Sequence, residues 1–139
     1  MDGNLPSVPD RPSKVKIGTL DYTIEWKSAE WEMEEKAFGQ CTTDRETIRI
    51  SERLTGYRLA SVFSHEVAHA LAYHFNCYDK VDPEQACDIA SYGMVMFWRD
   101  NPDAFIWWID LIHYIDKCDR VVTVRAMDGN PERTINIDK

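Results

Sequence analysis

The hydrophobic pattern of this 139-residue chain changes its period once, close to Leu54. Before that point, apolar and polar residues alternate in two stretches, Lys14–Trp26 and Phe38–Ser51, and each stretch contains a polar segment that can turn. Alternation is typical of strands with one buried face, so we predict two β-hairpins. The acidic segment Ser28–Lys36 between them can form a short helix or a loop.

The second half of the chain carries a helical period. Apolar residues recur every three or four positions and predict a helix over about residues 57–75. The tetrapeptide Asp82-Pro83-Glu84-Gln85 predicts the start of a second helix, because its residues suit a capping aspartate, a first-turn proline and a capping box. We expect this helix to run to about Arg99. Asn101-Pro102 repeats the start signal and predicts a third helix over about residues 102–117.

Strands followed by helices favour the α+β fold class. We expect a small antiparallel sheet, formed by the N-terminal hairpins and packed on a helical core, in a single domain over residues 13–120. Residues 1–12 contain three of the six prolines and should form a flexible lead-in. Residues 121–139 should form a tail with a strand and a turn.

The charge balance narrows the possible functions. The chain has 16 Lys and Arg against 24 Asp and Glu, a net charge of −8, which repels phosphate backbones, so we expect no nucleic-acid partner. The uncharged stretch Ile89–Trp98 is too short to cross a membrane, and we expect no membrane partner. The N-terminus has no basic start and no apolar segment of a secretory signal. We therefore expect a cytoplasmic protein whose four cysteines are free, mostly buried thiols.

The sequence His65-Glu66-Val67-Ala68-His69 is an HExxH motif inside the first predicted helix. Positions i and i+4 lie one turn apart on one helix face, so both imidazoles can bind one Zn²⁺ at about 2.0–2.1 Å. Glu66 can then reach a water molecule on the metal without binding the metal itself. The same motif can also arise by chance on an ordinary helix, and this alternative stays open.

A third metal ligand is available in the next predicted helix. Glu84 follows His69 by 15 residues, and Asp88 lies four residues further along the same helix face. Glu84 can bind the metal while Asp88 accepts the ring N–H of His65 or His69. Two alternatives remain: Glu84 is an ordinary acid of the first helical turn, or Asp88 is itself the ligand.

These residues resemble a known pattern. HExxH followed by Glu84 and Asp88 is similar to the gluzincins, in which a Glu on a later helix is the third zinc ligand. The segments Arg49–Leu54 and Phe63–Ala70 are similar to compact ImmA/IrrE-type metallopeptidase domains and to small HExxH proteins of bacteriophages and prophages. The resemblance spans about residues 38–102.

The resemblance implies a minimal zincin-like fold with one Zn²⁺ per chain, in the cytoplasm of a bacterium or a phage-infected host cell. It implies hydrolysis of peptide bonds in a protein or peptide substrate, with a zinc-bound water that loses its proton to Glu66. In the implied site, Glu66 is the catalytic residue. The metal ligands are His65, His69 and Glu84, and Asp88 is a carboxylate that holds a ligand from outside.

Other roles follow less directly from the sequence. The candidates for stabilising an oxyanion are Tyr73, Tyr78, Tyr114 and His113. For His113, which lies in an apolar helix, a position in the core is the more expected role. His74 should point away from the metal, because it lies five residues after His69. An exposed strand such as Thr47–Ser51 could pair with an extended substrate.

Two further functions compete with hydrolysis. The chain could be a non-enzymatic, zinc-containing binding module, such as a phage-encoded regulator or decoy. In that case the apolar helix at residues 102–117 could mediate self-association or docking of a regulator, although burial in the core is the expectation. A purely structural zinc site would need a fourth protein ligand, such as Cys77 or His74.

Overall fold

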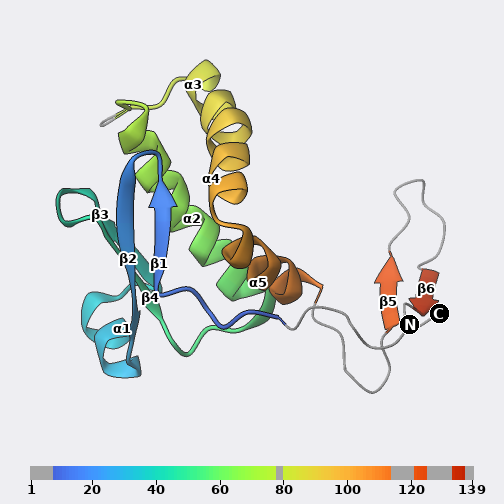
Figure 1. Ribbon diagram of the computed structural model, residues 1–139. Coiled ribbons are helices and arrows are strands. Elements are labelled where there is room, and N and C mark those ends of the chain that lie inside the picture. Colours follow the sequence, from blue (N-terminus) through green and yellow to red (C-terminus); the bar gives the residue numbers. More distant parts are fainter. Residues whose placement is uncertain (1–7, 78–79, 114–120, 125–132, 137–139) are drawn as a thin grey trace.

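The chain has an α+β fold, which confirms the predicted fold class (Figure 1). The computed structural model describes residues 8–77, 80–113, 121–124 and 133–136. In chain order the elements are β1 (Lys14–Ile17), β2 (Leu20–Lys27), α1 (Ala29–Glu35), β3 (Gly39–Thr42), the 3₁₀ turn η1 (Thr43–Arg45), β4 (Thr47–Ser51), α2 (Gly56–His74), α3 (Pro83–Asp88), the π-helical segment η2 (Ile89–Gly93), α4 (Met94–Asp100), α5 (Pro102–Ile112), β5 (Val121–Val124) and β6 (Arg133–Asn136).

Both predicted hairpins form, but the sheet is mixed rather than antiparallel. β1 pairs with β2 and β3 pairs with β4 in antiparallel fashion, whereas β2 and β4 are parallel neighbours. The strand order is therefore β1-β2-β4-β3. The expectation of an antiparallel sheet was wrong because the second hairpin joins the first through its second strand, after the α1 connection. This arrangement places Thr47–Ser51 in the middle of the sheet, so the prediction of an exposed strand there was also wrong.

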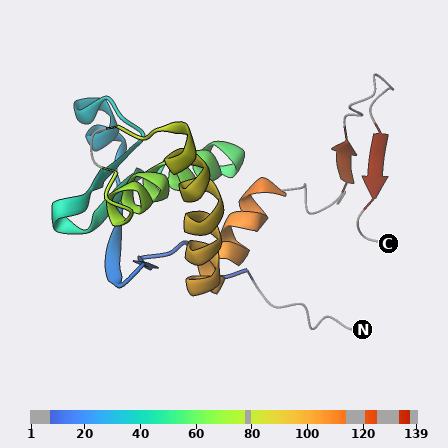
Figure 2. The ribbon, with the colours of Figure 1, turned by 90° about the horizontal axis from the view of Figure 1, so that it is seen from above.

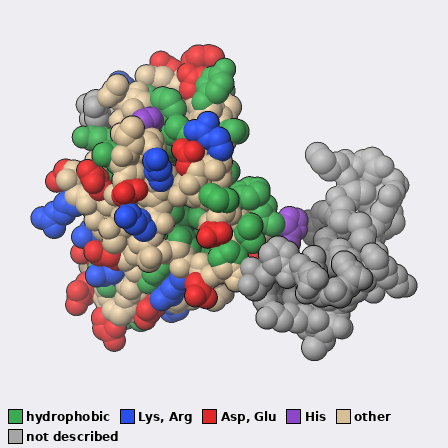
Figure 3. Space-filling model, in the orientation of Figure 1, with side chains coloured by type: hydrophobic (Ala, Val, Ile, Leu, Met, Phe, Trp, Pro, Cys, Tyr) green, Lys and Arg blue, Asp and Glu red, His purple; other side chains and the backbone are tan. Residues whose placement is uncertain are grey.

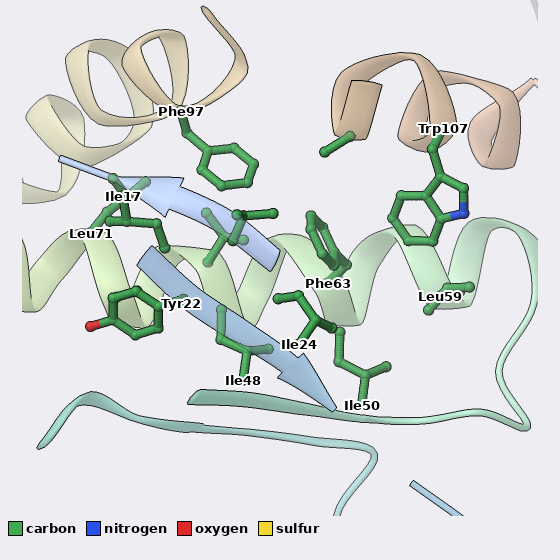
Figure 4. Packing of buried hydrophobic residues seen from close by; sticks show 14 of the residues in the cluster. Ile17, Tyr22, Ile24, Ile48, Ile50, Leu59, Phe63, Leu71, Phe97 and Trp107 are labelled. Atoms are coloured by element: carbon green, nitrogen blue, oxygen red, sulfur yellow. The ribbon is translucent and has the colours of Figure 1, made fainter. Parts of the chain in front are cut away.

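The core lies between one face of the sheet and helix α2. Alternate residues of the strands point to that face, and Ile48 and Ile50 at its centre are completely buried. Phe63 of α2 lies against them and contacts Trp107 of α5, with ring centroids 5.1 Å apart (Figure 4). Phe97 of α4 closes the same cluster. Burial of each large apolar side chain contributes about 1.5–3 kcal/mol, so this cluster fixes the orientation of α2.

The predicted second helix forms as three continuous segments, α3, η2 and α4. The capping box at its start is present, with the Asp82 side chain accepting from the Gln85 backbone N–H at 2.8 Å. The π-helical turn within it was not predicted. Gly93 ends that turn and is buried, and a Cβ there would lie 3.2 Å from the Phe75 ring and 3.4 Å from Leu71. Gly93 thus lets the segment cross close to α2 (Figure 2).

The Asn101 side chain does not cap helix α5, as its sequence position suggests, but binds the backbone of β1 and α4. Its Oδ1 accepts the Lys16 backbone N–H, and its Nδ2 donates to the carbonyl oxygens of Lys16 and Phe97, each at 2.8 Å. The amide therefore occupies hydrogen-bonding groups at the outer edge of β1. At the opposite end of the sheet, β3 forms the other edge.

Helix α5 contributes one face to the core and leaves another at the surface. Ala104 and Trp107 are buried, whereas Phe105 and Ile106 are 38% and 39% exposed. Apolar side chains gather over this helix in the space-filling view (Figure 3). The predicted continuation of this helix to residue 117 lies outside the described residues, as does the predicted turn of the tail. In the part of the chain that the structure describes, helices are either too short or too polar to cross a membrane.

Candidate metal centre

The HExxH motif lies in the middle of α2, where packing decides which way its side chains face. Phe63, Val67 and Leu71 are completely buried against the sheet, so His65 and His69 project from a different face of the helix. Their Nε2 atoms lie 3.2 Å apart, and their ring planes are at 82°. Two ligand atoms of a tetrahedral zinc ion lie about 3.3–3.4 Å apart when each is about 2.0–2.1 Å from the metal. This separation fits two ligands of one ion, and it also fits a hydrogen bond between the two rings.

His69 is suited to metal binding by its protonation as well as by its position. Packing around the ring, and then the neighbouring His65, hold the pKa of His69 below its ordinary value. The neutral imidazole, which is the form that binds metals, is therefore favoured.

Glu66 lies between α2 and β3 and is only 6% exposed. Burial raises the pKa of its carboxyl because the charged form is desolvated, and the nearby His65 opposes this shift. A carboxylate with a raised pKa is a stronger base than an exposed one, as a general base requires.

Gly39 allows β3 to approach this carboxylate closely. A Cβ at Gly39 would lie 2.8 Å from Cγ1 of Val62 and 2.9 Å from Oε2 of Glu66, which is closer than real side chains pack. The strand and the carboxylate can therefore occupy their positions together only because residue 39 has no side chain.

β3 and α2 form the walls of an open pocket of about 610 Å³. Both histidines and Glu66 line it, so the motif faces a space that a substrate can enter. The lining residues are Gly39, Gln40, Cys41, Thr43, His65, Glu66, His69, Ala72, Tyr73 and Cys77.

Two cysteines, Cys41 and Cys77, line this pocket. Burial, and then the charge of Glu66, raise the pKa of Cys41 to about 12, so its thiol stays protonated at neutral pH. Cys77 is buried, with its Sγ 3.6 Å from the carbonyl oxygen of Phe75. Cys87 is exposed, contrary to the expectation of buried thiols, since it lies in α3, which has no buried residue. Cys118 lies outside the described residues.

The structure does not bring Glu84 and Asp88 to the histidines. Glu84 is exposed in the first turn of α3, Asp88 is half-buried at its end, and neither lines the pocket. Within residues 8–77 and 80–113, no three His, Cys, Asp or Glu side chains form a group that could hold a metal ion. The residues therefore fit two ligands of a zinc site, and the roles of Glu84 and Asp88 stay predictions.

The residues predicted to stabilise an oxyanion or to be a fourth zinc ligand lie in different places. Tyr73 lines the pocket beside the motif. His113 is exposed at the end of α5, so the expected core position was wrong. His74 packs against Gly18 in the β1–β2 turn, which confirms that it points away from the motif and counts against it as a fourth ligand. Tyr78 and Tyr114 lie outside the described residues.

A comparison with known protein families gives a match over the sheet and the motif helix. Residues 16–83 match the SprT-like family, whose domains are zinc-metallopeptidase-like. This matched part runs from β1 through α2 and ends one residue before Glu84, so it contains both histidines and Glu66. Comparisons with curated proteins and with solved structures give no significant match. The chain is therefore similar to a zinc-metallopeptidase-like domain over its sheet and its motif helix.

Proposed function

We propose that the chain is a zinc-dependent peptidase that hydrolyses a protein or peptide with Glu66 as its general base. The observation that carries this proposal is the 3.2 Å approach of the His65 and His69 Nε2 atoms beside the buried Glu66 carboxyl. The SprT-like match over residues 16–83 supports the same class of activity.

The side chains of His65 and His69 would hold the metal together with Glu84, which is the proposed third ligand. When bound, Zn²⁺ supplies a Lewis acid that polarises the scissile carbonyl and acidifies water. Glu66 takes a proton from the attacking water and later gives it to the departing amine, which restores the carboxylate. The raised pKa of Glu66 favours the first of these steps, because it makes the carboxylate a better base.

Strand β3 is the proposed contact for an extended substrate. It is an edge strand, and its residues Gly39, Gln40 and Cys41 line the same pocket as the motif. Pairing of a peptide with this edge would place a carbonyl group near the two histidines. The role that the sequence suggested for Thr47–Ser51 thus passes to β3. Tyr73, on the same pocket, is the proposed donor to the oxyanion.

The test is the Glu66→Gln variant, assayed for hydrolysis of an unfolded protein such as reduced casein with one equivalent of zinc. We expect a loss of about 10²–10⁴-fold in rate with bound zinc unchanged, because the amide cannot accept a proton. The matched control is Glu34→Gln, an exposed acid on α1 that should retain full activity. His69→Ala should lose the metal. Equal turnover by Glu66→Gln and the native chain would eliminate the proposal.

A binding module without hydrolysis is the second candidate, favoured by the exposed Phe105 and Ile106 on α5. Exposed apolar residues side by side on one helix can dock a regulator or a second copy of the chain. Under this candidate, Ile106→Glu abolishes association in sedimentation experiments while Glu66→Gln leaves it unchanged. Association that is lost in neither variant, or absent in the native chain, counts against it.

A further inference from the structure

A second pocket lies on the other side of the two histidines. It is a groove of about 600 Å³ between α2 and the α3–η2 segment, and its walls are mostly apolar. We call it the α2–α3 groove. Its lining residues are Ser61, Ser64, His65, Ala68, His69, Ala72, Val81, Ala86, Ile89, Ala90 and Met94.

Small side chains keep this groove open. α2 presents Ala68 and Ala72 to it, and the facing segment presents Ala86 and Ala90. The helices approach each other elsewhere, at the buried Gly93, and so do not close over the groove. A space of this kind can take up an apolar group without moving the backbone.

Ser64 gives the groove a polar group that lacks a partner. Its Oγ is shielded from solvent and has no hydrogen-bond partner among the described residues. The usual acceptor for a helical serine is the carbonyl four residues earlier. Here that carbonyl, of Ala60, accepts the indole N–H of Trp108 at 3.0 Å. Ser64 therefore lies beside the groove with a hydroxyl that is unpaired among the described residues.

The groove and the β3–α2 pocket share His65 and His69 as walls. A carbonyl group at the two Nε2 atoms thus has the β3–α2 pocket, whose lining is about half polar, on one side and the mostly apolar groove on the other. The residues that flank such a carbonyl in an extended peptide project in opposite directions. One of them would face Gln40 and Thr43 in the pocket, and the other would face Ala68 and Ala90 in the groove.

We propose that the α2–α3 groove is a specificity pocket that binds a large apolar side chain, such as Leu or Met, next to the peptide bond that is cleaved. This inference rests on the proposed peptidase function and names its substrate class. It predicts that peptides with Leu at that position bind and react better than peptides with Asp or Ala.

The test separates binding from hydrolysis. Fluorescein-labelled ten-residue peptides of Gly, Ser and Lys, identical except for a central Leu, Ala or Asp, are titrated into the zinc-loaded, full-length Glu66→Gln variant. Fluorescence anisotropy should show at least about tenfold tighter binding of the Leu peptide than of the Asp peptide, a preference in the range that apolar pockets achieve. The native chain is assayed for cleavage of the same peptides.

A substitution that fills the groove provides the decisive comparison. Ala90→Leu, added to Glu66→Gln, should reduce the Leu preference to less than about threefold, because the new side chain occupies the space. The matched control is Val95→Leu, which adds bulk at a position that is 67% exposed and outside the groove, and it should keep the preference. Circular dichroism confirms that both variants fold.

The outcomes distinguish the two proposals. Leu-selective binding that Ala90→Leu removes and Val95→Leu retains supports the groove, even if the native chain cleaves nothing, in which case only the peptidase function falls. Cleavage without a Leu preference overturns the groove and leaves the peptidase function standing. A preference that survives Ala90→Leu also overturns the groove, and absence of both binding and cleavage overturns both proposals.

Discussion

The two sides of α2 differ in how firmly the surrounding chain fixes them. On the β3 side, the sheet holds the strand in register and Gly39 brings it against a buried carboxylate. On the α3 side, none of the six residues of helix α3 is buried. Acidic side chains also gather over this end of the molecule (Figure 3).

This difference separates the two chemical tasks of the candidate centre. The proposed base, Glu66, and the first two proposed ligands, His65 and His69, lie on a helix that core packing holds in place. The proposed third ligand, Glu84, lies on a segment that core packing does not hold. If Glu84 is the third ligand, its side chain therefore depends on the metal rather than on core packing for its final position.

Removal of the proposed ligand on the α3 side should affect metal binding and leave folding unchanged. Glu84→Gln should weaken zinc binding by at least about 10–100-fold, the loss that even an outer partner of a metal ligand causes. It should leave the stability of the metal-free chain unchanged within about 0.5 kcal/mol, because Glu84 is exposed. Competition with a fluorescent zinc chelator and urea unfolding measure the two effects.

Glu30→Gln is the matched control for this experiment, because Glu30 is an exposed acid in the first turn of α1. It experiences the same helix dipole but lies in another helix. Unchanged zinc affinity in Glu84→Gln would contradict the assignment, and Asp88→Asn would then test the alternative ligand.

A substitution on the β3 side should instead disturb stability and activity together. Gly39→Ala forces a Cβ against Val62 and Glu66, so we expect a stability loss of about 1–3 kcal/mol, as is typical of overpacking. The kcat for peptide hydrolysis should fall by about 10–100-fold with a smaller change in KM, because Glu66 is displaced. Urea unfolding and steady-state kinetics check both values.

Gly56→Asn provides the control for Gly39. Gly56 has a positive φ of 56°, which asparagine tolerates, and a Cβ there meets nothing within 4 Å. It should fold and react like the native chain. A fully active Gly39→Ala would show that the close approach of β3 to Glu66 has no functional importance.

The smallest effect concerns Tyr22, deep on the sheet side. Burial raises the pKa of its hydroxyl to about 12 from an ordinary value of 10.0. The folded chain therefore binds this proton more tightly than the unfolded chain, so the contribution is complete below pH 10 and is lost as the pH rises towards 12. Between pH 9 and pH 11 the native chain should become less stable for this reason. The Tyr22→Phe variant should lose up to about 1 kcal/mol less of its free energy of unfolding over the same range.

Urea unfolding at the two pH values measures this difference, and identical pH dependence in both proteins would contradict it. No such change is expected for Tyr57→Phe, since the Tyr57 side chain is 76% exposed. The comparison thus tests whether the sheet side is as tightly packed as its burial indicates.

Local patterns made much of the fold predictable from the sequence. Alternation marked the hairpins, and the capping box at Asp82 and Gln85 marked the start of the second helical segment. Helical spacing also predicted that His65 and His69 share a face, and their Nε2 atoms do approach each other. Each of these features depends on residues close together in the chain.

Features that depend on distant residues were not predictable in this way. The parallel pairing of Ile24 with Ile48 joins strands separated by α1 and a hairpin, and no local pattern records it. The contact of Gly39 with Glu66 likewise depends on the packing of a strand on a helix. Only the position of Gly39 at the start of a predicted strand arm hinted at a close approach, because glycine is uncommon inside strands.

The amide of Asn101 on the β1 edge has a consequence for the behaviour of the whole molecule in solution. Unprotected strand edges invite other chains to add on, and stacking of such additions leads to insoluble fibres. By engaging both backbone groups of Lys16, a single side chain blunts one end of the sheet. Growth from one molecule to the next is thereby interrupted, and the opposite end can stay accessible without making the protein prone to polymerise.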